Sequence, residues 1–119
     1  MDSIWADSHF SEHVCGLYKL ETIVIPEGVT EIKWNAFAGC NTLSKITIPK
    51  STTTIGSAAF NYCIGLQSIV VLAETPPMGA GKMFDESSCP IYVPAGSVEA
   101  YKAAQYWSDY ADRIQAIQE

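Results

Sequence analysis

Basic residues are scarce in this 119-residue sequence, where 7 Lys and Arg stand against 13 Asp and Glu and the formal net charge is −6. A protein that binds the nucleic-acid backbone needs clustered Lys and Arg, so we expect no nucleic-acid partner. Long apolar runs are also missing, since the longest, residues 69–73, is far shorter than the roughly 20 residues of a membrane span. A hydrophobic content of 48% nevertheless excludes a disordered chain. The length then allows one small, acidic, folded domain.

Cysteine and targeting signals are sparse as well. The four cysteines contain no CxxC pair, which argues against a zinc ribbon and a thioredoxin-type site. They are Cys15, Cys40, Cys63 and Cys89, and their nearly even spacing indicates a repeat. The first residues show no basic stretch followed by an apolar one, so no signal peptide is predicted. A cytoplasmic protein and a mature or excised fragment both fit this observation.

Motifs for catalysis, cofactors or metals are not found. His9 and His13 are spaced for one helix face next to Cys15, but no HExxH motif accompanies them, and ordinary polar positions are expected. No GxSxG elbow, phosphate-binding glycine loop or calcium loop occurs. The neighbouring carboxylates are expected on solvated surfaces; they are Glu27 with Glu31, Asp85 with Glu86, and Asp109 with Asp112. We therefore predict no catalytic, cofactor-binding or metal-binding residue and no enzyme.

A repeat of 23 residues dominates the sequence that is present. The shared pattern is L-x-x-I-x-[IV], a turn, and I-x-x-x-A-F-x-x-C-x-x-L. The matched positions are Ile25-Pro26 with Ile48-Pro49, Ile32 with Ile55, Ala36-Phe37 with Ala59-Phe60, Cys40 with Cys63, Leu43 with Leu66, Ile46 with Ile69, and Ile48 with Val71. Partial copies flank the two full ones, upstream around residues 14–26 and downstream from Phe84 to Pro94. This period lies in the range of about 20–29 residues of leucine-rich repeats.

Each part of the pattern predicts a local structure. The alternating apolar residues indicate a short strand, which proline ends because it has no N–H for the ladder. The spacing of 3 in A-F-x-x-C-x-x-L suits a short helix or 3₁₀ turn. Cys40 and Cys63 share one phase between Phe and Leu, which favours buried, inert residues. Equivalent positions on adjacent repeats come within disulfide range, so a bridge between these two stays open.

The units 25–32, 36–40 and 43–49 resemble the BspA-type leucine-rich-repeat family, which is widespread in bacterial surface proteins. The tail 93–102, with Trp107 and Ile114, is similar to the C-terminal end of such arrays. Lys33-Trp34 and Thr52 depart from the family pattern, which usually has Gly at the first place and Val at the second. The resemblance implies an α/β repeat fold: a short solenoid with a small parallel sheet, loop or 3₁₀ turns opposite, and a C-terminal helical cap.

The expected division of the single domain is an irregular segment 1–13, about four repeat units over 14–94, and a cap over 95–119. Gly96 or Ser97 is predicted to start a helix, with Ser97 as N-cap, and a last short strand is expected at 113–117. The inward stripe is expected to contain Val98, Tyr101, Ala104 and Trp107. Two prolines and two glycines make 73–82 a loop, either a connector to the cap or a protruding contact loop.

The residues between the inward ones of each strand should point outward and align in columns between repeats. The predicted binding residues are Thr22, Lys45 and Ser68 in one column and Val24, Thr47, Val70 and Tyr92 in the next. Strand-forming residues on an ordinary sheet surface also explain this composition. The resemblance implies a non-enzymatic protein-binding or adhesion module, at the cell surface or secreted, whose partner is another protein such as a host or matrix component. A spacer or capping fragment without its own ligand is the alternative.

Overall fold

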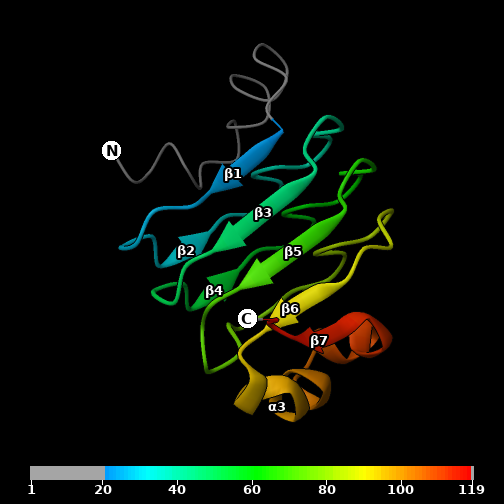
Figure 1. Ribbon diagram of the computed structural model, residues 1–119. Helices are drawn as coiled ribbons and strands as arrows, with labels where there is room; N and C mark the ends of the chain where they lie inside the picture. The colour runs from blue at the N-terminus through cyan, green and yellow to red at the C-terminus, as the bar shows by residue number, and fades with distance from the viewer. Residues whose placement is uncertain (1–20, 119) are drawn as a thin grey trace.

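The computed structural model describes residues 21–118. The segment 1–13, with His9 and His13, and also Cys15 lie outside the described residues. Five short strands form one sheet in the order β1-β3-β5-β6-β7, and every neighbouring pair is parallel. Their bounds are Thr22–Val24 for β1, Lys45–Ile48 for β3, Ser68–Val71 for β5, Ile91–Val93 for β6 and Ile114–Ala116 for β7. Figure 1 shows these strands side by side along the molecule.

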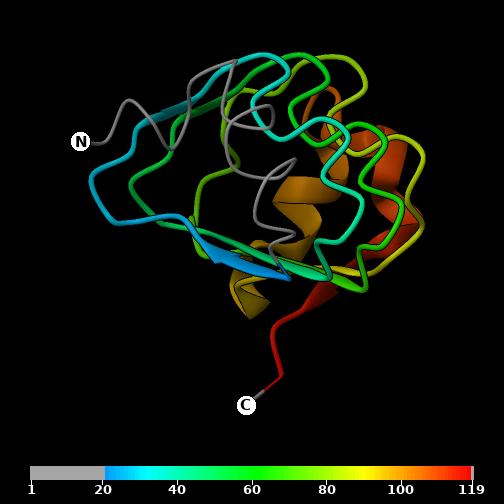
Figure 2. The same ribbon diagram turned by 90° about the horizontal axis from the view of Figure 1, so that it is seen from above.

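The repeat period sets the register of this sheet. Ile23, Ile46 and Ile69 are paired across β1, β3 and β5, and each is buried. Their neighbours along each strand alternate between the interior and the surface, as a pleated strand requires. A second, smaller parallel pair, β2 (Glu31–Ile32) and β4 (Thr54–Ile55), follows the turn after each proline. Successive repeats therefore stack directly on one another (Figure 2).

The segment after each small strand consists of single turns of the 3₁₀ type, one of the predicted forms, and it does not continue as a helix. Its N–H groups alternate between two directions. The Ala36 N–H donates to the Lys33 carbonyl three residues back, whereas the Phe37 N–H donates to the Ala59 carbonyl of the next repeat. A helix would direct all of these bonds along the chain. Half of the donors instead join one repeat to the next.

Left-handed residues make this alternation feasible. Asn35, Ala58 and Lys82 have φ of 62°, 57° and 61° at corresponding places in three repeats. A second such position is filled by Gly39, Tyr62 and Glu86, with φ of 78°, 62° and 66°. A residue with positive φ reverses the local handedness of the backbone. This left-handed conformation costs about 1–2 kcal/mol for any residue other than glycine. The bonds between repeats maintain that conformation.

Phenylalanine side chains form a stack through the interior. The Phe37 and Phe60 rings lie 5.1 Å apart with an angle of 4° between their planes, and Phe60 and Phe84 lie 5.4 Å apart at 13°. All three are fully buried. Offset aromatic stacking adds about 0.5–1.5 kcal/mol per pair beyond the buried area. The stack continues to Trp107, whose ring is 5.6 Å from that of Phe84.

The C-terminal segment comprises η2 (Ala95–Ser97), α3 (Val98–Ala103), η3 (Trp107–Arg113) and β7. Tyr101 and Trp107 are buried, and Val98 and Ala104 pack against the core, as the expected stripe requires. Figure 1 shows α3 beyond β6, at the end of the sheet where β7 lies. The last strand falls within the predicted 113–117.

Side chains of this segment bind carbonyls of the loop before β6. The Tyr101 hydroxyl donates to Ala73 O at 2.5 Å, and the Trp107 indole N–H donates to Pro77 O at 2.8 Å. Ser97 is the N-cap residue of α3, as predicted, but its hydroxyl donates to Glu74 O at 2.6 Å and makes no capping bond. The Ser97 hydroxyl therefore binds the loop and not the first turn of α3.

Membrane-spanning helices were searched for within residues 21–118, and none there is both long and apolar enough.

Candidate functional site

The outward side chains of the five-stranded sheet line up as the sequence predicts. The ladder pairs Thr22 with Lys45 and Lys45 with Ser68. The next column runs from Val24 through Thr47 and Val70 to Tyr92, again by direct pairing. All seven predicted binding residues therefore lie on one continuous surface, which we call the outward face.

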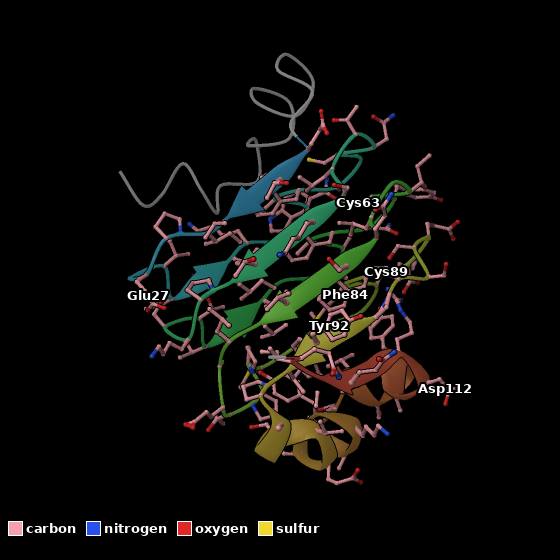
Figure 3. All side chains as sticks on the ribbon, viewed as in Figure 1. Glu27, Cys63, Phe84, Cys89, Tyr92 and Asp112 are labelled. Carbon is pink, nitrogen blue, oxygen red and sulfur yellow. The ribbon has the colours of Figure 1, made fainter. Side chains whose placement is uncertain are left out.

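The outward face combines exposed and half-buried side chains. Val24 is 61% exposed, Thr22 and Lys45 are also exposed, and the others are half-buried. Tyr92 lies on β6 towards the C-terminal end of the sheet (Figure 3). Lys45 is the one charged group among the seven residues, in a chain whose net charge is −6. The face therefore offers hydroxyl, aliphatic and aromatic groups, and no carboxylate, to a partner.

Sequence reasoning missed two members of this face. Gln115 on β7 pairs with Tyr92 and extends the second column by one exposed residue. The expected strand at 113–117 already contained the signal, because Gln115 has the phase of an outward residue there. Leu72 directly follows β5, and its N–H donates to the Ile48 carbonyl. It is 37% exposed, whereas the corresponding positions of the preceding repeats hold Pro26 and Pro49.

At Met78 the loop 73–82 is hydrogen-bonded to the preceding repeat. The Met78 N–H donates to Thr53 O, and the Met78 carbonyl accepts from the Ile55 N–H. Met78 thus continues the small ladder of β2 and β4 through a bridge to Thr54. Its side chain is 74% exposed, so the same residue also protrudes.

The cysteines of the repeat do not form a pair with each other. Cys63 is a free, fully buried thiol that donates to the Phe37 carbonyl at 3.0 Å, and Cys40 is disulfide-bonded. Burial raises the pKa of the Cys63 thiol to about 12. The open alternative of a Cys40–Cys63 bridge is thereby wrong. The predicted burial is confirmed at both positions, whereas only Cys63 is a free thiol.

Cys89 is also a free, buried thiol, and its pKa is raised by burial. Arg113 lies against it, with Nη2 at 3.7 Å from Sγ, and opposes this rise. Figure 3 places Cys63 and Cys89 at the opposite end of the repeats from Glu27. A nucleophilic cysteine needs a lowered pKa, so neither thiol has the environment of a catalytic group.

The predicted carboxylate pairs have structural partners or remain on the surface. Glu27 Oε2 accepts from the Lys50 N–H at 3.2 Å, and Asp85 Oδ1 accepts from the Tyr110 hydroxyl at 2.7 Å. The Tyr110 oxygen also accepts from the Phe84 N–H, and burial raises the pKa of Tyr110 to about 12. Within residues 21–118 no group of three His, Cys, Asp or Glu side chains is placed to hold a metal ion.

Comparison with known proteins identifies the repeat. The model of the BspA type leucine rich repeat region, in six copies, matches residues 9–89, which is more than half of the chain. No curated protein matches the chain.

Proposed function

Because the chain belongs to the BspA-type leucine-rich-repeat family, we propose that it is a non-enzymatic protein-binding or adhesion module of a cell-surface or secreted protein. Its contact surface in this proposal is the outward face. Leucine-rich repeats act as protein-interaction modules, which supports the general class. The partner is another protein, such as a component of a host cell or its matrix.

The alignment of Tyr92 with Val70 and Thr47 in one column is the observation that carries the proposal. Tyr is favoured in contact surfaces because it brings area and a hydrogen-bonding group at a low cost in side-chain entropy. The column is uncharged, so a partner would not have to desolvate a carboxylate of this face on binding. Lys45, one column away, supplies a single charge at the margin.

The test compares partner capture with thermal stability. Tyr92→Ala and Lys45→Glu should reduce the amount of protein captured from a matrix extract, while the melting temperature changes little, because both side chains point outward. The matched control is Ile64→Ala, which changes a 65%-exposed side chain that is not on the outward face. Equal capture by wild type and both face variants would refute the assignment of the face.

A spacer without its own ligand is the second candidate, and the small size of the sheet favours it. The five strands contain only three or four residues each. A stable protein–protein interface covers about 800 Å² on each partner, which is a large demand on so short a surface. A spacer should capture no protein above background from any extract.

We further infer that the single domain divides into repeats over 14–94 and a cap over 95–119. The burial of Tyr101 and Trp107 and the contact between Trp107 and Phe84 support this division, since the cap would cover the last phenylalanine of the stack. Repeat arrays need closed ends to keep apolar residues from water. Deletion of 95–119 should then cause aggregation or loss of the folded state.

A further inference from the structure

A hollow of about 750 Å³ opens next to Leu72, at the margin of the outward face where β5 ends. It is lined by residues of two repeats and by Pro94, which follows β6. The lining residues are Lys50, Thr52, Thr53, Leu72, Ala73, Glu74, Thr75, Pro76, Pro77 and Pro94. We call this hollow the Leu72 groove.

The groove exists because the hydrogen bonds that join neighbouring repeats after their strands are missing between residues 50–53 and residues 73–77. In the first two repeats the corners are tied together: the Lys50 N–H donates to Glu27, the Gly28 N–H to Ser51 Oγ, and the Thr52 hydroxyl to Val29 O. Residues 73–77 make no such bonds to the corner of the second repeat. Their carbonyls bind Ser97, Tyr101 and Trp107 instead. The loop therefore follows the C-terminal segment and leaves a gap towards residues 50–53.

The lining of the groove combines apolar side chains with two opposite charges. Leu72 and Pro94 continue the outward face beyond Val70 and Tyr92. Lys50 comes from the second repeat and Glu74 from the loop, and both are exposed. Neither charged side chain has a hydrogen-bonding or ionic partner within residues 21–118. A peptide in the groove would therefore meet one cation and one anion in the same lining.

We propose that the Leu72 groove receives an extended peptide segment of the partner protein, which packs one aliphatic or aromatic side chain on Leu72 and Pro94. The flanking residues of that segment carry an acidic group facing Lys50 and a basic group facing Glu74. The two opposite charges fix the direction of the peptide, because reversing it would place like charges together. This inference rests on the proposed function and names the part of the partner that the margin of the face recognises.

The open shape favours a chain over a small molecule. Small-molecule sites bury 70–90% of their ligand in an enclosed pocket. This groove is open to solvent and continuous with the outward face, so a segment can enter it while the rest of the partner contacts Tyr92. Its volume suffices for one large side chain and its neighbours.

The experiment uses the full chain and linear seven-residue peptides displayed on phage. We expect the enriched peptides to share an apolar residue flanked by one acidic and one basic residue in a fixed order. The dissociation constant of one synthetic winner is then measured by fluorescence anisotropy. Leu72→Lys should weaken binding at least tenfold. Ile64→Lys adds the same charge at an exposed aliphatic side chain that is not on the outward face, and it should leave the dissociation constant within twofold.

A charge swap supplies the second arm. The double variant Lys50→Glu, Glu74→Lys should no longer bind the selected peptide and should bind a peptide whose two charges are exchanged. Both substitutions are at exposed positions, so this arm decides the matter even if Leu72→Lys does not fold. Failure to enrich any peptide, equal effects of Leu72→Lys and Ile64→Lys, or unchanged peptide preference in the charge-swapped variant would each overturn the inference. Binding that depends on Tyr92 and ignores Leu72 would overturn the groove and leave the proposed function standing.

Discussion

Arg113 binds the main chain of Cys89, with its Nε donating to the Cys89 carbonyl at 2.8 Å. The same guanidinium donates to the Phe84 carbonyl at 3.3 Å and to Ser87 Oγ at 3.1 Å. It also lies 5.4 Å from the centre of the Tyr110 ring. One side chain from the C-terminal segment thereby fixes the turn of the last repeat.

Replacement of Arg113 by Lys should destabilise the protein by about 1–3 kcal/mol. Lysine keeps the charge but cannot present the planar set of donors that reaches three acceptors at once. Urea unfolding followed by circular dichroism measures the change. Lys102→Met is the control, because Lys102 is half-buried on α3 and its side chain makes no hydrogen bond within residues 21–118. Equal unfolding free energies for Arg113→Lys and wild type would show that the guanidinium contacts contribute nothing.

Gly39 and Tyr62 provide a matched test of the left-handed positions. Gly39→Ala should cost about 1 kcal/mol through the backbone alone, because φ is 78° and no atom lies within 4 Å of the added Cβ. Tyr62→Gly at the corresponding place should stabilise by about 0.5–1 kcal/mol, since Tyr62 is exposed and its φ is 62°. Thermal melts measure both.

Gly96→Ala is the control for this pair. Gly96 also has open space around an added Cβ, but its φ lies outside the left-handed region. Alanine there should be neutral or stabilising by a few tenths of a kcal/mol. If Gly39→Ala and Gly96→Ala changed stability equally, the left-handed conformation at Gly39 would have no measurable cost.

Alkaline pH should weaken the fold through Cys63. Below about pH 9 this thiol is protonated in both the folded and the unfolded chain, so it adds no pH dependence. Between about pH 9 and the folded pKa of about 12, the unfolded chain loses the proton and the folded chain keeps it. The free energy of unfolding then falls by up to about 1.4 kcal/mol per pH unit. Buried Tyr110, with a pKa raised to about 12, adds to the loss above pH 10.

Urea unfolding at pH 8, 9 and 10 with wild type and Cys63→Ala isolates the contribution of this thiol. The variant carries a constant cost from the lost side chain, so the slopes with pH are compared and not the absolute values. Cys63→Ala should show a shallower decline between pH 9 and pH 10. Identical slopes would mean that the Cys63 thiol ionises as readily in the folded chain as in the unfolded one.

Much of the sheet could be predicted from the sequence, because its buried and exposed positions repeat at a fixed period. The alternation around Ile23, Ile46 and Ile69 fixed which side chains are inward, and a repeat of 23 residues fixed their pairing. The seven outward residues could therefore be named before the fold was known. Gln115 was missed although its strand was expected, since the outward columns were not extended into the last strand.

The turns were harder because their cause is not local. A spacing of 3 around Phe37 suits a helical turn as well as the observed alternation. What decides between them is the carbonyl of Ala59, 22 residues away, which takes the Phe37 N–H. Ala58 and Tyr62 carry no sequence signal for positive φ. The hydrogen bond of Ser97 was equally hard to predict, since its hydroxyl donates to the Glu74 carbonyl, which is distant in the sequence.

The outward face as a contact surface is tested most directly by nuclear magnetic resonance with a protein captured from a matrix extract. On titration, the methyl signals of Val24 and Val70 and the ring signals of Tyr92 should shift or broaden. Signals of Ile64 and of the Met78 methyl, on exposed side chains away from these columns, should stay unchanged. Shifts confined to Ile64 and Met78, with Val70 and Tyr92 unaffected, would contradict the account.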